Sequence, residues 1–135
     1  LYIDQECSVL APGLTVFEQT ERFNASHLAE HELKSILNRY LFPYETWDKP
    51  CFCLSGGEKI RLLFCCLMIG NNAPDVFILD EPTNNLDIQS VEIITAAIKS
   101  YRGTVLLISH DHYFVKEIKI NRSIKLFDTG SVIKI

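Results

Sequence analysis

The chain has 135 residues, of which 47% are apolar and 22% charged, a composition typical of a globular domain with one modest core. Thirteen basic and seventeen acidic side chains give a formal net charge of −4, which argues against an RNA-binding face within this segment. There is no secretory leader pattern and no apolar run near the roughly 20 residues that span a bilayer. We therefore expect at most one domain and no membrane span. Because the chain opens with Leu1 rather than methionine, we also expect an excised fragment.

The five cysteines match neither the even set of a disulfide-stapled scaffold nor the C-x-x-C pairs of a zinc site. We interpret them as thiols in a reducing, cytoplasmic environment. Cys65 and Cys66 lie in an apolar stretch, where cysteine behaves as a small hydrophobe.

The first third of the chain is predicted to hold a strand end and two helices. Residues 1–5 read as the end of a core strand, and residues 11–13, Ala-Pro-Gly, as a turn. Thr15 and Glu18 form the pattern of a capping box that opens a short helix. A longer helix is predicted over residues 26–40. Its apolar stripe comprises Leu33, Ile36, Leu37, Tyr40 and Leu41.

Residues 27–31, His-Leu-Ala-Glu-His, fit the H-x-x-E-H pattern of inverted zinc peptidases. The predicted helix has another explanation, because its apolar stripe leaves both histidines and the glutamate to solvent. A third ligand is also missing, so we interpret the segment as a solvated helix face. We also interpret the His-Asp-His run at 110–112 as a chance match to a metal-binding pattern.

The segment after residue 42 predicts a loop followed by a capped helix. Residues 43–50 contain two prolines and no periodicity. Ser55 and Glu58 then form a second capping box, with Ser55 as N-cap. Gly56 and Gly57 leave the first helical amides unshielded, and bare N–H groups at a positive dipole end favour a phosphate. An ordinary cap of a buried helix is the alternative, since the residues that follow are mostly apolar.

Residues 76–79 are four apolar residues in a row and predict a buried parallel strand. The strand ends in two carboxylates, Asp80 and Glu81. Ligands of open α/β sheets collect at this end of the strands, where Asp80 could hold Mg²⁺ and Glu81 could polarise a water. The alternative is a solvated turn over residues 80–83.

A second strand is predicted over residues 104–109, with His110 and Asp111 at its C-terminal end. Two adjacent parallel strands would bring these side chains and the two carboxylates to one edge. Between the strands, Asp87 is a credible N-cap and Gly103 a C-cap residue of a helix. The apolar residues of that helix are Val91, Ile94, Ile98 and Tyr101.

The remaining segment predicts a helical turn over 113–117 and two strands, 122–127 and 131–135, around a turn. No G-x-x-x-x-G-K-[ST] loop that could cradle the phosphates of a nucleotide occurs anywhere in the chain.

Taken together, these residues resemble the C-terminal half of an ATP-binding-cassette (ABC) ATPase. Gln5 resembles the Q-loop glutamine of that family. Residues 54–58 look like its signature, 77–81 like its Walker B strand and catalytic glutamate, 85–87 like its D-loop, and 109–111 like its switch-histidine loop.

The resemblance implies an α/β fold, a partial P-loop NTPase (ABC cassette) that lacks Walker A. A helical subdomain with the signature is expected over about 6–70. The parallel-sheet core half, with a C-terminal hairpin, is expected over 71–135.

ATP and Mg²⁺ are the cofactors that the resemblance implies, with ATP hydrolysis in the intact protein. Glu81 would be the catalytic base and His110 would contact the γ-phosphate. Asp80 would hold Mg²⁺, with Gln5 sensing metal or water. The full nucleotide-binding set is Gln5, Ser55, Gly56, Gly57, Glu58, Asp80 and Asp87, of which the signature residues would reach the nucleotide of a second cassette.

The sequences of residues 81–87, 55–61 and 109–114 are similar to the corresponding motifs of the ABC-F branch of the family. These are soluble proteins with two cassettes in one chain, and members act at the ribosome as translation or antibiotic-resistance factors. The resemblance therefore implies a second cassette in the same parent chain and a ribosome partner. One departure is Asn85, where the branch usually has histidine.

Three other interpretations stay open: the ATPase subunit of a membrane transporter, a DNA-repair ATPase without its coiled coil, and a non-enzymatic binding module. We expect the isolated segment to lack ATPase activity, because the phosphate loop is absent. We also expect it to self-associate through uncovered sheet surface.

Overall fold

The computed structural model of the chain describes residues 1–3, 7–70, 74–84, 86–126 and 132–134. Gln5, Asn85 and the predicted 128–130 turn lie outside these ranges. The described helices are α1 (Val16–Phe23), α2 (Glu30–Arg39), α3 (Gly56–Ile69), α4 (Ile88–Ser100) and α5 (His112–Glu117), with short 3-10 helices η1 (Tyr44–Thr46) and η2 (Cys51–Cys53). The strands are β1 (Tyr2–Ile3), β2 (Val76–Asp80), β3 (Thr104–Ile108), β4 (Ile124–Leu126) and β5 (Val132–Lys134).

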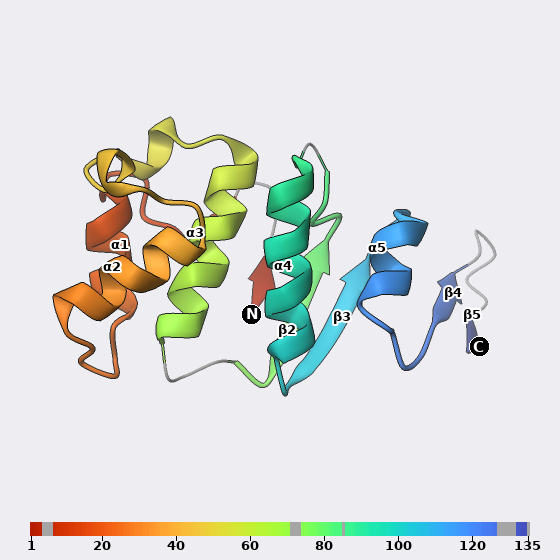
Figure 1. The fold of residues 1–135 in the computed structure, drawn as a ribbon. Coiled ribbons are helices and arrows are strands. Elements are labelled where there is room, and N and C mark those ends of the chain that lie inside the picture. The colour runs from red at the N-terminus through yellow and green to blue at the C-terminus, as the bar shows by residue number, and fades with distance from the viewer. Residues whose placement is uncertain (4–6, 71–73, 85, 127–131, 135) are drawn as a thin grey trace.

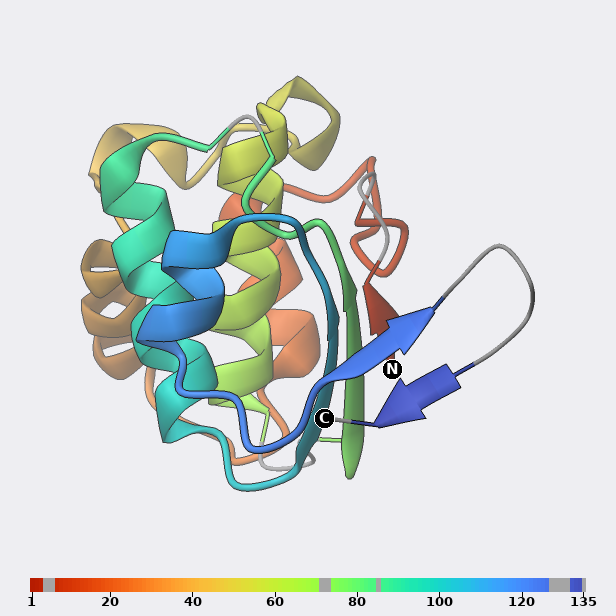
Figure 2. The ribbon, with the colours of Figure 1, turned by 90° about the vertical axis from the view of Figure 1, so that its right-hand side faces the viewer.

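A parallel sheet with the order β1-β2-β3 forms the core half of the molecule. Helices α3, α4 and α5 lie against one face of this sheet (Figure 2). Helices α1 and α2 extend the structure on the far side of α3 (Figure 1). The predicted α/β architecture, with a helical part beside a parallel sheet, is therefore confirmed.

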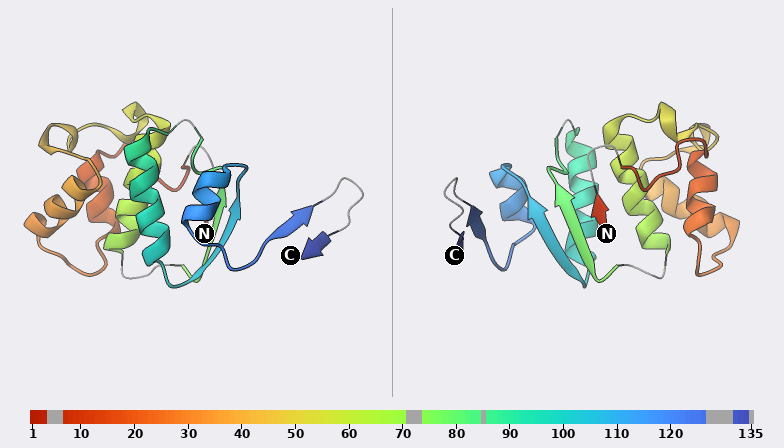
Figure 3. Two further views of the ribbon diagram at one scale, coloured as in Figure 1. Left: turned by 45° about the vertical axis from the view of Figure 1, so that its right-hand side comes forward. Right: turned by 180° about the vertical axis from the view of Figure 1, so that it is seen from behind.

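The C-terminal strands β4 and β5 pair antiparallel, as the sequence predicts, and form a sheet of their own. This hairpin projects away from the body of the molecule (Figure 3). It adds no strand to the three that position the candidate site.

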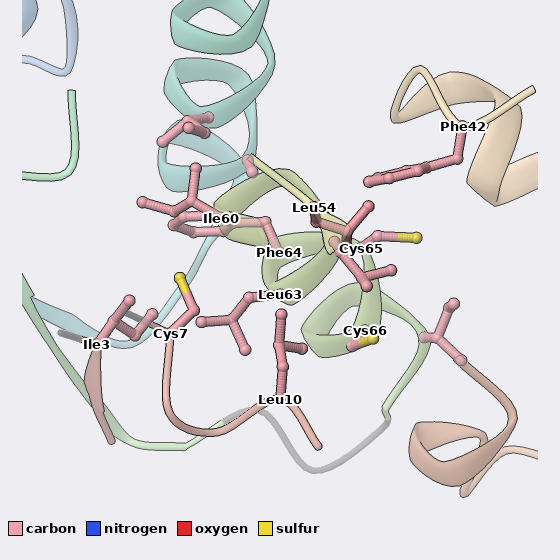
Figure 4. Packing of buried hydrophobic residues seen from close by; sticks show 14 of the residues in the cluster. Ile3, Cys7, Leu10, Phe42, Leu54, Ile60, Leu63, Phe64, Cys65 and Cys66 are labelled. Atoms are coloured by element: carbon pink, nitrogen blue, oxygen red, sulfur yellow. The ribbon is translucent and has the colours of Figure 1, made fainter. Parts of the chain in front are cut away.

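Helix α3 is the centre of the core. Five consecutive side chains, at residues 62–66, are buried, and so are Ile60 and Ile69. A helix with apolar side chains on more than one face needs neighbours on several sides, and α3 packs against α1, α2 and α4. Side chains from β1, the following loop and the segment after α2 lie around it (Figure 4).

The longer helix begins later than predicted. Helix α2 starts at Glu30, not at residue 26. The Asn24 side chain explains this, because its amide donates to the Leu28 carbonyl and its oxygen accepts from the Leu28 N–H, both at 2.9 Å. His27 adopts a left-handed φ of 52°. The helix ends at Arg39, so Leu41, expected in the apolar stripe, is exposed instead.

Two further expectations were wrong in detail. Strand β2 is buried on one face only: Phe77 and Leu79 point to the helices, whereas Val76 is exposed. Gly103 is not the C-cap residue of α4, since Tyr101 takes that position with extended backbone. The Tyr101 ring packs against Phe77 with centroids 4.4 Å apart, and its hydroxyl donates to the Pro74 carbonyl.

Candidate functional site

The carboxyl ends of β2 and β3 bring Glu81 and His110 into direct contact. Asp80 is the last residue of β2 and pairs in register with Ile108, so Glu81 and the residues after β3 reach the same sheet edge. His110 Nδ1 lies 2.6 Å from Glu81 Oε1. The Glu81 side chain is 19% exposed and that of His110 is 79% exposed. The two residues predicted to be catalytic therefore form one pair, open to solvent on the histidine side.

Glu81 is held in an unusual backbone conformation. Its φ is 47°, a left-handed value that is uncommon for residues other than glycine and costs free energy. The Glu81 N–H donates to the Ile108 carbonyl at 2.8 Å, and its carbonyl accepts from the Asn84 N–H. Among the described residues, no donor reaches its buried Oε2. The carboxylate thus has one oxygen that contacts His110 and one that is buried without a donor among the described residues.

Asp80 receives a hydrogen bond that sequence reasoning missed. The Tyr2 hydroxyl donates to Asp80 Oδ2 at 3.1 Å, across the β1-β2 pair. The contact depends on the register of β1 against β2, in which Tyr2 pairs with Ile78, and the sequence of β1 alone does not give that register.

The capping box of α3 forms as predicted. The Glu58 N–H donates to Ser55 Oγ at 3.2 Å, and the Ser55 N–H donates to Glu58 Oε2 at 2.7 Å. The Lys49 ammonium donates to both Glu58 oxygens, at 3.1 and 3.2 Å. Burial raises the pKa of the Glu58 carboxyl, but the hydrogen bonds from Ser55 and Lys49 outweigh burial and lower it overall. Glu58 therefore caps the N-terminus of α3. Its partner Lys49 is a second residue that sequence reasoning missed.

The two glycines of the α3 N-terminus differ in their surroundings. A Cβ at Gly56 would meet nothing within 4 Å, and Gly56 itself is exposed. A Cβ at Gly57 would lie 3.0 Å from Leu86 Cδ2. Unhindered first-turn amides at the positive end of a 14-residue helix suit a phosphate oxygen. The roles of Gly56 and Gly57 in binding a phosphate stay predictions, and Gly57 lies beside the Leu86 side chain from the loop before α4.

Asp87 is the N-cap of α4, as predicted. Its carboxylate accepts from the Ser90 N–H at 2.8 Å and from the Ser90 hydroxyl at 2.9 Å. These hydrogen bonds lower the pKa of the Asp87 carboxyl. Asp111 caps α5 in the same way, accepting from the N–H groups of Tyr113 and Phe114. Both acids are used by helix ends, and the predicted nucleotide role of Asp87 stays a prediction.

The structure does not bring His27 and His31 together on one helix face. His27 lies outside α2 while His31 lies within it, so they do not share a helix face. In the part of the chain that the structure describes, no three His, Cys, Asp or Glu side chains gather to hold a metal ion. His27, Glu30 and His31 are all exposed, as expected, but only Glu30 and His31 lie in the helix.

Similarity to known proteins decides the family. The family profile described as "ABC transporter" matches residues 1–84. The chain belongs to the ABC transporter family. Its curated relatives include F family members. ABC transporter F family member 5 of Arabidopsis thaliana is 45% identical over 128 residues, which are 94% of this chain and 18% of the relative.

Two further relatives agree with the F branch of the ABC family. ABC transporter F family member 2 of Arabidopsis thaliana is 46% identical over 73% of this chain and 14% of its own length. The probable ATP-binding protein YbiT of Escherichia coli O157:H7 is 43% identical over 78% of this chain and 19% of its own length. The chain thus spans less than a quarter of the length of these relatives.

Solved ABC cassettes share the fold. The ATP-binding cassette MJ0796, in a dimeric post-hydrolysis state with ADP and Pi, has a TM-score of 0.70 over 98% of this chain and 61% of its own, at 22% identity. The RNase-L inhibitor has a TM-score of 0.70 over 99% of this chain and 26% of its own, at 24% identity. Of the helices that the structure describes, none is long and apolar enough to cross a membrane.

Proposed function

We propose that this chain is the signature-bearing half of a nucleotide-binding cassette in an ABC-F ATPase. In the intact protein this cassette binds and hydrolyses ATP with Mg²⁺. The observation that carries the proposal is the Glu81–His110 pair, 2.6 Å apart at the sheet edge where Asp80 ends β2. Three groups suited to base, phosphate contact and metal binding meet at one place.

The residues of this edge divide the chemistry among them. The Glu81 carboxylate, which ends at the sheet edge beside His110, is suited to accept a proton from an attacking water. His110 orients that carboxylate and lies 79% exposed, where a phosphate oxygen can reach it. Asp80 offers a carboxylate oxygen to a hard cation. Bound Mg²⁺ would supply charge neutralisation at the phosphates. We also assign Gln5, which lies outside the described residues, to this set.

The signature acts on a second cassette in this proposal. Ser55 caps α3, and the exposed helix N-terminus at Gly56 suits a γ-phosphate that another cassette holds. Nucleotide between two cassettes would then close the pair, and hydrolysis would release it. The MJ0796 cassette was solved as a dimer in a post-hydrolysis state bound to ADP and Pi, so paired cassettes with nucleotide are known for that protein.

We further propose that the parent protein is cytoplasmic and works at the ribosome. The F-family relatives favour this over a transporter subunit, and the five cysteines carry no disulfide. One structural neighbour, an archaeal ribosome recycling factor, was solved with a ribosomal stalk protein. The net charge of −4 implies that basic ribosome contacts lie outside this segment.

The Glu81 assignment is tested in the full-length protein by Glu81→Gln. We expect turnover to fall by about 10²–10⁴, because a general base is lost, and the ATP-bound closed state to accumulate. Glu92→Gln is the matched control, since Glu92 is an exposed glutamate on α4. Phosphate release measures both variants. An unchanged rate in Glu81→Gln would contradict the base assignment.

Ribosome binding separates the two candidate functions. The Glu81→Gln protein should sediment with ribosomes in ATP and stay in the supernatant in ADP. If it traps ATP but never sediments with ribosomes, the ribosomal proposal is wrong and the transporter alternative is favoured.

The isolated chain is expected to bind no ATP, because it has no phosphate loop. Calorimetry with Mg²⁺ would compare it with a version extended upstream by about half a domain, roughly 80 residues. Binding by the extended version alone supports the proposal. Binding by this chain itself would mean that the phosphates go elsewhere.

A further inference from the structure

The hydrogen bond between Tyr2 and Asp80 follows from the register of the sheet. Tyr2 pairs with Ile78, and Ile3 pairs with Leu79, on parallel strands. Ile3 and Leu79 are buried against the helices, so Tyr2, Ile78 and Asp80 share the opposite face. Asp80 lies one two-residue repeat beyond Ile78, about 6–7 Å along the strand. A phenol ring spans that distance, and its hydroxyl reaches Asp80 Oδ2 at 3.1 Å.

This hydrogen bond makes the two oxygens of the Asp80 carboxylate inequivalent. Oδ2 accepts from Tyr2, and the hydrogen bonds of the described residues leave Oδ1 without a protein donor. A tyrosine hydroxyl donates without adding charge, so the carboxylate keeps its full negative charge. Lysine or arginine at this position would instead compete with a cation for the same carboxylate. The arrangement is that of a metal ligand oriented by a neighbouring hydrogen-bond donor.

We propose that Tyr2 is a positioning residue that fixes the Asp80 carboxylate and leaves Oδ1 for the divalent cation that accompanies the nucleotide. This inference rests on the proposed function, because it assigns the cation to Asp80. Tyr2 lies at the sheet edge and is 50% exposed, so the hydrogen bond orders a side chain that would otherwise sample several rotamers in water. Its loss should weaken the cation site and spare the contacts that hold the nucleotide.

The experiment uses the full-length protein and Mn²⁺ as the probe. Mn²⁺ affinity is measured by electron paramagnetic resonance with a saturating non-hydrolysable ATP analogue, and analogue affinity is measured separately in EDTA. Asp80→Asn identifies the Mn²⁺ binding step that belongs to this cassette. Tyr2→Phe removes only the hydroxyl, and Tyr44→Phe is the matched control, since Tyr44 is an exposed tyrosine on η1 that packs edge-on against Trp47.

We expect Tyr2→Phe to weaken Mn²⁺ binding about threefold to tenfold, as for loss of one hydrogen bond. Analogue affinity in EDTA should stay unchanged, and Tyr44→Phe should match the parent in both measurements. Parental Mn²⁺ affinity in Tyr2→Phe would overturn the inference, as would an equal loss of Mn²⁺ and analogue binding, which indicates a purely structural role. Retained Mn²⁺ binding in Asp80→Asn overturns it too. Failure of the parent itself to bind the analogue would instead overturn the proposed function, and the inference with it.

Discussion

At the scale of single residues, the cysteines separate into one exposed thiol and four buried ones. Cys53 lies exposed on η2, whereas Cys7, Cys51, Cys65 and Cys66 are buried. Burial raises the pKa of Cys51, Cys65 and Cys66, and the thiolate is the reactive form of cysteine. Burial therefore slows the reaction of these three thiols in two ways: it shields them from reagents and it keeps them protonated.

We predict that a thiol reagent such as Ellman's reagent modifies Cys53 rapidly in the native chain and the other four cysteines only as the chain unfolds. The Cys53→Ser variant should lose the fast phase and keep the slow one. Serine is a polar replacement at this exposed position and should leave stability unchanged. Rapid modification of two or more cysteines in the unsubstituted chain would contradict the burial described here.

At the scale of elements, the pair of glycines that opens α3 offers a matched comparison. Gly56→Ala places its Cβ in open space, whereas Gly57→Ala places one 3.0 Å from Leu86 Cδ2. We predict that Gly56→Ala stabilises the fold by about 0.5–1 kcal/mol, because alanine restricts the unfolded chain. Gly57→Ala should gain less, since Leu86 must shift by a few tenths of an ångström.

Urea denaturation measures both variants, and methyl NMR of Leu86 reports the displacement. The Leu86 methyl signals should move in Gly57→Ala and stay in place in Gly56→Ala. Equal stabilisation by the two substitutions, with Leu86 unmoved, would show that Gly57 and Leu86 are not in contact.

The capping box of α3 makes part of the stability dependent on pH. The pKa of Glu58 is lowered in the fold, so its contribution is present above the ordinary glutamate pKa of about 4.3 and is lost as pH falls through the lower, folded value. We predict that Lys49→Met lowers the free energy of unfolding by less than about 1 kcal/mol at pH 7, since the pair is partly exposed.

The loss in Lys49→Met should shrink as pH falls through the folded pKa of Glu58, because protonation removes the charge that Lys49 pairs with. Lys99→Met is the control: Lys99 and Glu117 also lie 3.2 Å apart but are more exposed, so it should cost less. Thermal unfolding from pH 3 to 8 measures both. A loss in Lys49→Met that is independent of pH would assign it to packing of the lysine stem.

Local signals predicted most elements, and tertiary contacts decided the rest. Both capping boxes and the two apolar strands have strong, short-range patterns, and the structure contains all of them. The start of α2 could not be predicted, because it depends on two hydrogen bonds from Asn24 to Leu28. The contacts of Tyr2 with Asp80 and of Lys49 with Glu58 depend on register and on loop folding, which no single segment of sequence specifies.

At the scale of the whole molecule, one face of the parallel sheet has no layer over it among the described residues. The helices cover the other face (Figure 2), and β3 alternates between partly buried and exposed side chains. Exposed apolar side chains on the uncovered face are Tyr2, Val76, Leu106 and Ile108. Contiguous apolar surface of this kind favours association.

We predict that the isolated chain self-associates in a concentration-dependent manner. Replacing Leu106 and Ile108 by threonine should shift it toward monomer, because threonine keeps β propensity and reduces apolar area. Light scattering over a range of concentrations measures this. A clean monomer of the parent chain at all concentrations would contradict the prediction.

The burial of α3 has a consequence for how the signature can move. Its N-terminus presents Gly56 to solvent, but the side chains of residues 62–66 are enclosed by three other helices. Unwinding the helix would open the core, so the signature can travel only as the tip of a rigid body. The amide hydrogens at 62–66 should accordingly exchange with deuterium only when the entire fold opens, while those at the tip exchange early. Any displacement of the α3 tip must then carry the helices packed against α3, namely α1, α2 and α4, along with it.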